Sequence, residues 1–366
     1  MLKKRKTAKR ATAGVTAKRG TKKRATTKRT AAKRTATKRT ATKRTATKRT
    51  AAKRTAAKRG ATKRTTSKPG TTSRASAGTM TTEGAVMIYR VKASAAAARR
   101  QGATAPFSIT IHFLGGLTAA QQKAFTKAAD RWTRVIVGDL PSVVIGGVRI
   151  DDVLIEAEGV RIDGPGEILG QAAPTMLRPR NAGAAAFLPA KGIMSFDTAD
   201  LGAMERDGTL NDVITHEMGH VLGIGTIWDL KRLLQGAGTR NPTFVGAAAK
   251  KEFGLLKGRT VAPTPVPVEN RGGDGTADSH WRDTVFQNEL MTGFVGAAPN
   301  PMSRLTVASL QDLGYKVDVT KAERYSLPAA AAMPGEGEIK IHAGTPEHRG
   351  MRPSAPIVLP DTSLVP

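Results

Sequence analysis

Two histidines and a glutamate between them, His216, Glu217 and His220, have a spacing that can support metal chemistry. Residues four apart lie on one face of an α-helix, about 5–6 Å apart at Cβ, so both imidazoles can reach one metal ion. Glu217 is then positioned to act as a base on a water molecule held by that ion. The alternative is that these residues lie on a partly buried helix and bind no metal, because a pattern with three fixed positions also arises by chance. The helical context favours zinc bound by the two histidines.

Three helices are predicted around this motif. Residues 210–222 carry the motif itself, and residues 305–313 form a helix that ends at Gly314. A longer helix begins with Thr118 as N-cap and extends to about Val137. Its buried face is marked by apolar residues at helical spacing, namely Phe125, Ala128, Ala129, Trp132 and Ile136.

Short β-rich segments separated by glycine and proline lie between these helices. The folded part is expected to open with a half-buried strand at residues 107–113, before the Gly115-Gly116 turn. Further strands are predicted at residues 143–145, 148–157 and 192–197. The last of these is either a sheet edge that pairs with an extended substrate or an ordinary core strand. The fold class that follows is α+β, with a mixed sheet and an active-site helix.

The third zinc ligand is not apparent from the motif alone. The chain has no cysteine, so zinc must be held by histidine and carboxylate. Gly223 follows His220 by three residues, where a metzincin peptidase needs its helix to end. In compact metzincins a third histidine comes three residues later, and here that position is Thr226. The ligand must therefore come from farther along the chain.

Two later segments, Asp278-Ser279-His280-Trp281 and Asn288-Glu289-Leu290-Met291-Thr292-Gly293, resemble leishmanolysin. In that metzincin family an insertion separates the first two zinc histidines from the third, and a methionine-containing turn follows. The resemblance covers roughly residues 105–325. It implies a zincin-like catalytic domain and a zinc metalloendopeptidase, with His280 as third ligand and Met291 in the Met-turn. Because the chain lacks cysteine, it looks more like compact bacterial relatives than like the cysteine-rich eukaryotic members.

A gluzincin-type site is the runner-up, in which Glu289 is the third ligand in place of His280. The other histidines and Asp212 are predicted to have roles outside zinc coordination. His112 lies in a strand pattern and is expected to be structural, whereas His342 and His348 are expected to be solvated. Asp212 lies in the first turn of the motif helix. It either complements the helix dipole or orients a zinc ligand through a hydrogen bond, without binding the metal itself.

Positive charge is concentrated at the N-terminus. Residues 1–80 hold 29 of the 59 Lys and Arg residues and no Asp or Glu, and Lys-Arg recurs every five residues from Lys18 to Arg64. A five-residue step spreads charge around all faces of a helix, so we interpret residues 1–80 as a disordered basic tail and linker. Residues 81–327 are then the zinc metallopeptidase domain. Residues 328–366, rich in Pro, Ala and Gly, are predicted to form an extended, partly disordered arm.

The expected partners are a protein or peptide substrate and, through residues 1–80, nucleic acid or another polyanion. An alternative function is that the basic tail is the main functional element and the folded part only its carrier. No stretch of the sequence approaches a transmembrane helix. The N-terminus is basic but is not followed by the apolar segment of a signal peptide, so a secreted and a cytoplasmic location both remain open.

Overall fold

The computed structural model describes residues 78–166, 168–258, 262–273, 275–295, 298–328, 339–340 and 355–365. Most of the predicted basic tail, residues 1–77, lies outside the described residues, as do His342 and His348 of the predicted C-terminal arm. The folded unit that the structure describes begins at residue 78.

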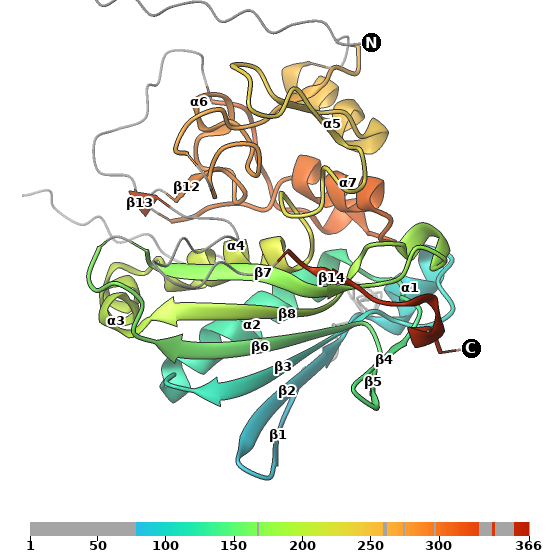
Figure 1. Ribbon diagram of the computed structural model, residues 1–366. Coiled ribbons are helices and arrows are strands. Elements are labelled where there is room, and N and C mark those ends of the chain that lie inside the picture. Colours follow the sequence, from blue (N-terminus) through green and yellow to red (C-terminus); the bar gives the residue numbers. More distant parts are fainter. Residues whose placement is uncertain are drawn as a thin grey trace, which may run out of the picture. The chain divides into compact units, whose positions relative to one another are not determined.

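A seven-stranded mixed sheet forms one layer of this unit (Figure 1). Across the sheet the strands are β1 (Thr79–Glu83), β2 (Val86–Lys92), β3 (Ser108–Gly115), β6 (Val153–Val160), β8 (Pro189–Asp197), β7 (Gly170–Leu177) and β14 (Ile357–Val358). The pairs β3–β6, β6–β8 and β7–β14 are parallel, whereas β1–β2, β2–β3 and β7–β8 are antiparallel. The mixed sheet and the helices confirm the predicted α+β class.

Three sequence predictions about the sheet need correction, and one open alternative is decided. The folded part does not open at residue 107, because β1 and β2 precede it and Thr79 and Met80 belong to β1. Residues 148–157 are not one strand: β5 (Val148–Ile150) pairs with β4 (Val143–Ile145) in a separate hairpin, while β6 joins the main sheet. Of the two alternatives for residues 192–197, the core strand is correct, since β8 lies between β6 and β7. Residues 355–365 of the predicted arm pack on the domain, where β14 extends the sheet beside β7.

Seven α-helices lie in the described part of the chain: α1 (Ala95–Arg100), α2 (Ala119–Val135), α3 (Thr198–Asp207), α4 (Leu210–Val221), α5 (Ala247–Lys257), α6 (Asp283–Phe286) and α7 (Arg304–Leu313). The three predicted helices are confirmed as α2, α4 and α7. Thr118 caps α2 in a reciprocal capping box with Gln121, and Gly314 ends α7 in a left-handed conformation with φ +117°. Local sequence signals were therefore sufficient for these helices.

The hydrophobic core lies between the sheet and α2 and α4. Phe125 and Trp132 of α2 are fully buried, and Phe125 meets Phe113 and Phe196 of the sheet edge to face. Figure 1 shows α4 running close to the β7 side of the sheet, with α5, α6 and α7 beyond it. α4 is thus enclosed between the sheet and the C-terminal half of the unit.

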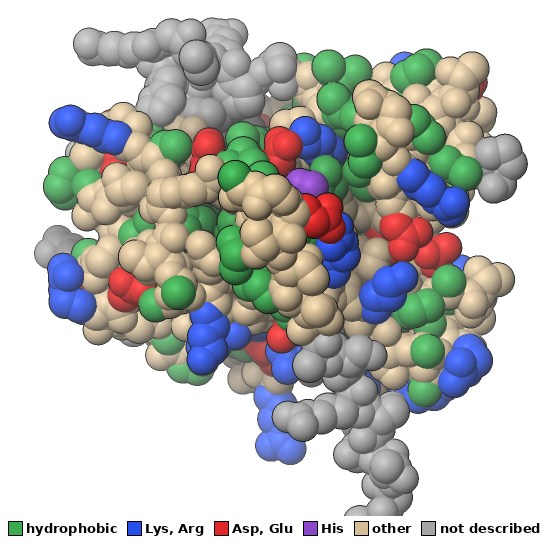
Figure 2. All heavy atoms as spheres, turned by 90° about the horizontal axis from the view of Figure 1, so that it is seen from below, with side chains coloured by type: hydrophobic (Ala, Val, Ile, Leu, Met, Phe, Trp, Pro, Cys, Tyr) green, Lys and Arg blue, Asp and Glu red, His purple; other side chains and the backbone are tan. Residues whose placement is uncertain are grey.

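Short elements complete the C-terminal half and the loops. They are the strands β9 (Leu234–Gln235), β10 (Thr243–Phe244), β11 (Val266–Pro267), β12 (Phe294–Val295) and β13 (Ile339–Lys340), and the 3-10 turns η1 (Gly183–Ala185), η2 (Val319–Lys321) and η3 (Asp361–Ser363). No helix among the described residues has the length and apolar character needed to cross a bilayer. On the face seen in Figure 2, basic and acidic side chains are interspersed. This face therefore lacks the uniformly positive charge of residues 1–80.

Candidate metal centre

α4 is buried on every side, which is unusual for a helix that carries so many polar residues. Its apolar side chains Val213, Ile214, Met218 and Val221 are fully buried, but so are His216, Glu217 and His220. A buried polar group needs a partner, because desolvation without one costs on the order of 1–3 kcal/mol. The polar residues of α4 therefore call for a specific chemical explanation.

Gly223 ends α4 and turns the chain back beneath the metal motif. Its φ of +105° lies in the region that side-chain-bearing residues avoid, as expected from its position after the motif. The turn brings the carbonyl oxygen of Ile224 to 2.8 Å from His220 Nδ1, and Thr226 Oγ1 donates to the His220 carbonyl oxygen at 2.8 Å. At Gly225 a side chain would collide with the carbonyl of Ser279, so this turn also packs against the loop that carries the third histidine.

His280 is positioned by a loop wrapped around one buried acid, Glu269. The Glu269 main chain bonds to His280 O and to Asp278 N at 2.8 and 2.9 Å. Its carboxylate accepts from the main-chain N–H groups of Asn270, Arg271 and Asp283 at 2.8–3.1 Å. Sequence analysis missed Glu269, because the sequence has no local signal that distinguishes it from other acids.

The neighbouring Trp281 fixes the same loop from the other side. Its indole N–H donates to Thr306 Oγ1 at 2.8 Å, and its ring stacks on Trp228 with centroids 4.8 Å apart. Both tryptophans are fully buried. His280 therefore projects from a rigid loop, although its segment contains no long helix or strand.

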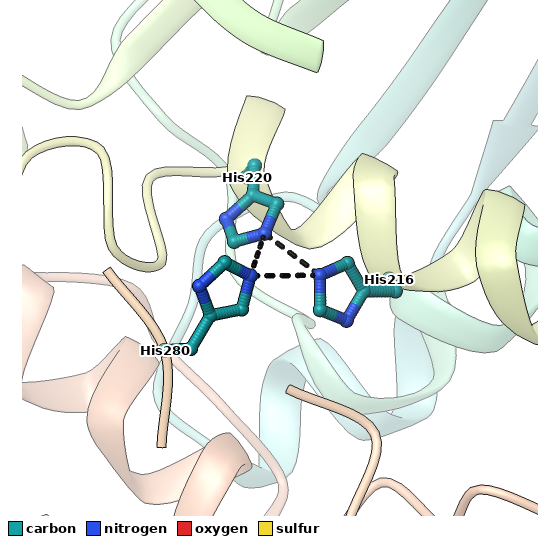
Figure 3. Close-up of side chains that lie close together, drawn as sticks. All are labelled: His216, His220 and His280. Carbon is teal, nitrogen blue, oxygen red and sulfur yellow. Dashed lines mark hydrogen bonds between the residues drawn. The ribbon is translucent and has the colours of Figure 1, made fainter. Parts of the chain in front are cut away.

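The three histidines meet at their Nε2 atoms, which form a nearly equilateral triangle with sides of 2.9, 3.1 and 3.1 Å (Figure 3). Each ring also places its Nδ1 next to a main-chain carbonyl oxygen, which can only accept. These are the oxygens of Leu290 at 2.6 Å from His216, Ile224 at 2.8 Å from His220 and Thr276 at 2.9 Å from His280.

The tautomer of each ring follows from these contacts. With its proton on Nδ1, each imidazole presents a lone pair at Nε2, and three converging lone pairs cannot hydrogen-bond to one another. A point about 2 Å from all three nitrogens exists above the triangle, which is the distance a zinc ion requires. His216, His220 and His280 could thus hold a metal ion.

Burial acts on the protonation of this cluster in the direction that metal binding needs. It lowers the pKa of His216 to about 4 and that of His220 well below its usual value, so both rings are neutral near pH 7. It raises the pKa of Glu217 well above its usual range. Neither carboxylate oxygen of Glu217 has a hydrogen-bond partner in the described part of the chain. The carboxyl group of Glu217 is therefore available to a ligand that enters this site.

Met291 lies directly against α4 at Gly219, which stands between the two motif histidines in the sequence. A Cβ atom placed on Gly219 would be 2.8 Å from Met291 Sδ and 3.0 Å from Trp132 Cζ2, so these buried side chains would have to shift to accept one. Gly219 is therefore needed for close packing rather than for backbone freedom. The main chain before Met291 also contributes, since the Leu290 carbonyl is the acceptor for His216.

Glu289 does not join the cluster. Its buried carboxylate accepts from Met291 N at 2.7 Å, from Ser303 N and Oγ at 3.0 and 2.6 Å, and from Thr306 Oγ1 at 2.6 Å. Burial raises the pKa of Glu289, although these four donors oppose the shift. The structure thus brings His280, and not Glu289, to the first two histidines.

The remaining candidates lie elsewhere. Asp212 forms an ion pair with Arg131 at 2.9 Å and accepts from Asn300 N at 3.0 Å, which ties α4 to α2 and to the segment before α7. Of the two roles that we predicted for Asp212, support of a zinc ligand is not seen in these contacts, which reach Arg131 and Asn300 and none of the three histidines. His112 is half-buried within β3, opposite Glu156 of β6, and burial and then Arg90 lower its pKa.

Fold and cluster together define a class. The organisation is that of a metzincin-type peptidase domain. It comprises a mixed sheet, a buried helix bearing the HExxH motif, a glycine turn after it, a distant third histidine and a methionine packed against the motif helix.

The comparisons with known proteins agree. Residues 184–332 match the family model of leishmanolysin. Leishmanolysin of Leishmania chagasi is 32% identical over 142 residues, which are 37% of this chain and 23% of that protein, and Leishmania major leishmanolysin matches to the same extent. A leishmanolysin-like peptidase of Caenorhabditis elegans is 47% identical over 49 residues, 13% of this chain and 7% of the relative. The matches thus span less than a quarter of the relatives' length. They confirm the predicted resemblance to this family of zinc metalloendopeptidases.

Proposed function

We propose that this protein is a zinc metalloendopeptidase, in which His216, His220 and His280 hold zinc and Glu217 is the general base. The observation that carries the proposal is the convergence of three Nε2 lone pairs beside a buried glutamate with unpartnered oxygens. Imidazole nitrogens suit zinc, and three protein ligands leave a fourth position for water or substrate. A closed structural site would instead have four protein ligands.

A zinc ion bound there supplies a Lewis acid that polarises the scissile carbonyl and acidifies the attacking water. Glu217 accepts the proton of that water as its oxygen bonds to the carbonyl carbon. The same carboxyl group then returns the proton to the amine nitrogen as the C–N bond breaks. Burial raises the pKa of Glu217, which makes its carboxylate a stronger base than an exposed one and favours the first step.

The outer edge of β7 is where the substrate is proposed to bind. The β8 strand, for which an edge role was considered, has neighbours on both sides. β14 pairs with β7 only at Met176 and Leu177, so the first part of β7 has no strand on its outer side within the described residues. An extended peptide can add to such an edge through main-chain hydrogen bonds.

The test is zinc content and cleavage of a general peptide substrate by the purified protein, with and without a chelator. Cleavage should be lost on zinc removal, restored by added zinc, and absent in His280→Ala. Cleavage that persists after complete zinc removal would contradict the proposal. The Glu252→Gln variant is a suitable control, since Glu252 pairs with Arg304 on α7 and contacts none of the three histidines.

A second proposal concerns residues 1–80. Evenly spaced Lys-Arg pairs without any acidic residue would neutralise phosphates with little sequence preference, so we propose that this tail binds nucleic acid or a similar polyanion. A tethered peptidase domain would then be concentrated on that polyanion.

A further inference from the structure

The segment that carries His280 approaches the other two histidines from outside α4 (Figure 3). Trp281, next to the histidine, forms an antiparallel bridge with Val268 on one side and a parallel bridge with Thr292 on the other. Its main-chain N–H donates to Met291 O at 2.9 Å. The third histidine is therefore held between the Met-turn and the end of the insertion, residues 224–279, that separates it from the first two.

Glu269 continues the contact on the insertion side. Its main-chain N–H donates to His280 O at 2.8 Å, and its carbonyl oxygen accepts from Asp278 N at 2.9 Å. Asp278 has a φ of +64°, in the left-handed region that residues with a side chain adopt at a cost. Such a conformation persists only where neighbouring contacts fix it. The bond to Glu269 is one of these contacts, two residues before the histidine.

The carboxylate of Glu269 joins the beginning and the end of one loop, residues 270–283. Its Oε1 accepts from the main-chain N–H groups of Asn270 and Arg271 at 2.9 and 3.1 Å, and its Oε2 accepts from Asp283 N at 2.8 Å. The side chain is fully buried. One carboxylate thus closes the loop that carries His280.

The same loop provides the group that orients the His280 ring. Thr276 O lies 2.9 Å from His280 Nδ1, which fixes the tautomer that leaves Nε2 for a metal. A Cβ atom on Gly293, after the Met-turn, would be 2.7 Å from Thr276 Cγ2 and 3.7 Å from both Glu269 Cγ and His280 Cβ. The ligand, the residue that orients it and Glu269 therefore pack around one glycine.

We propose that Glu269 is a positioning residue of the zinc site, whose carboxylate strengthens zinc binding by closing the loop that carries His280. The inference rests on the proposed function, since it concerns the same three histidines. Without the carboxylate, the main-chain bonds of residue 269 remain, but the end of the loop at Asp283 loses its anchor. Nε2 of His280 is then no longer fixed 3.1 Å from the other two Nε2 atoms, and metal binding has to order the loop.

Asp312 of α7 offers a matched control for a purely structural role. Like Glu269, it holds main-chain N–H groups: its two oxygens accept from Ala248 N and Ala249 N, both at 2.9 Å, at the start of α5. Neither bond involves the loop of residues 270–283. Removal of either carboxylate should lower stability, but only removal of Glu269 should change zinc binding.

The experiment is the zinc affinity of the full chain in Glu269→Ala and Asp312→Ala, measured by competition with a chelator where circular dichroism shows both variants to be folded. Glu269→Ala should bind zinc about 10–100-fold more weakly than the parent, the range for residues that orient a metal ligand, and Asp312→Ala should bind it as the parent does. Glu269→Gln keeps one acceptor oxygen, so its affinity should lie between those of the parent and Glu269→Ala. The visible spectrum of Co²⁺ in place of zinc, which depends on the number and geometry of its ligands, should change in Glu269→Ala and not in Asp312→Ala.

Two results would overturn the inference. One is a Glu269→Ala protein with the zinc affinity and the Co²⁺ spectrum of the parent, and the other is an equal loss of affinity in Asp312→Ala, which would show a general effect of lower stability. If Glu269→Ala does not fold, Glu269→Gln and Asp312→Asn give the same comparison, and equal affinities would again overturn it. A parent protein that binds no zinc would instead refute the proposed function, and this inference with it.

Discussion

Replacing Glu289 by alanine tests how the Met-turn is held and whether this carboxylate is structural. The change removes the acceptor of four hydrogen bonds, two from hydroxyl groups and two from the main-chain N–H groups of Met291 and Ser303. The hydroxyl groups of Ser303 and Thr306 can rotate, whereas the two main-chain N–H groups are fixed in direction. A buried donor left without a partner costs about 1–3 kcal/mol, so the two together give about 2–6 kcal/mol.

Part of this cost is offset. The pKa of Glu289 is raised by burial, so the carboxylate itself is desolvated at a cost that alanine does not have. We therefore expect the unfolding free energy to fall by about 2–4 kcal/mol, measured by urea denaturation at pH 7. Glu289→Gln retains one acceptor oxygen and should lose less.

Zinc affinity distinguishes support from ligation. Glu289 fixes Met291, and the preceding Leu290 carbonyl orients His216, so Glu289→Ala should weaken zinc binding by about 10–100-fold, as for other supporting residues. His280→Ala removes a ligand and should weaken it far more, in competition with a chelator. If Glu289→Ala instead loses zinc as completely as His280→Ala and keeps its stability, the carboxylate is a ligand and the positioning argument fails.

Three further changes have defined outcomes. Gly219→Ala forces a methyl group against Met291 and Trp132, so we expect the unfolding free energy in urea to fall by about 1–3 kcal/mol and peptide cleavage to slow. Gly202→Ala in α3 is the control: the nearest atom is 3.5 Å from its new Cβ, so this change should be neutral or stabilising. Equal effects of the two changes would refute the packing argument. In zinc-free protein, burial lowers the pKa of His216 to about 4, so on acidification the folded state binds this proton at a lower pH than the unfolded chain does. The unfolding free energy should therefore fall as the pH drops from about 6.5 to 4, by about 3 kcal/mol from this residue. A flat profile, or the same fall in His216→Ala, would contradict this. Binding of DNA or RNA by the full chain, followed in a fluorescence titration, should weaken about 10³–10⁵-fold between 50 and 200 mM salt if about 6–10 phosphates are contacted. Equal binding by a chain without residues 1–80 would exclude the tail as the binding element.

The features that sequence analysis predicted well are local ones. The α2 helix has its capping residue and its apolar face within one continuous segment, and α7 has its terminating glycine next to it. The HExxH spacing likewise contains its own geometry, since two histidines four residues apart must share a helix face. Such signals do not depend on the rest of the chain.

What sequence analysis missed depends on distant contacts. The β2 strand has alternating apolar residues, a signal that was available, but its place in the sheet depends on pairing with β3. The position of β8 inside the sheet depends on its pairing with both β6 and β7. The addition of β14 beside β7 joins Ile357 to Met176, which lies far earlier in the chain. Glu269 acts by organising the main chain around His280, and no residue pattern near it indicates that role.

The most direct test of the central claim is peptide turnover by a Glu217→Ala protein whose zinc content has been measured. Glu217 is proposed to serve the attacking water and not the metal. The variant should therefore bind one zinc ion per chain, as the parent does, while its turnover falls by about 10²–10⁴-fold, the contribution of a positioned base. Turnover equal to that of the parent in the zinc-loaded variant would show that Glu217 is not the base, and the proposed mechanism would be wrong.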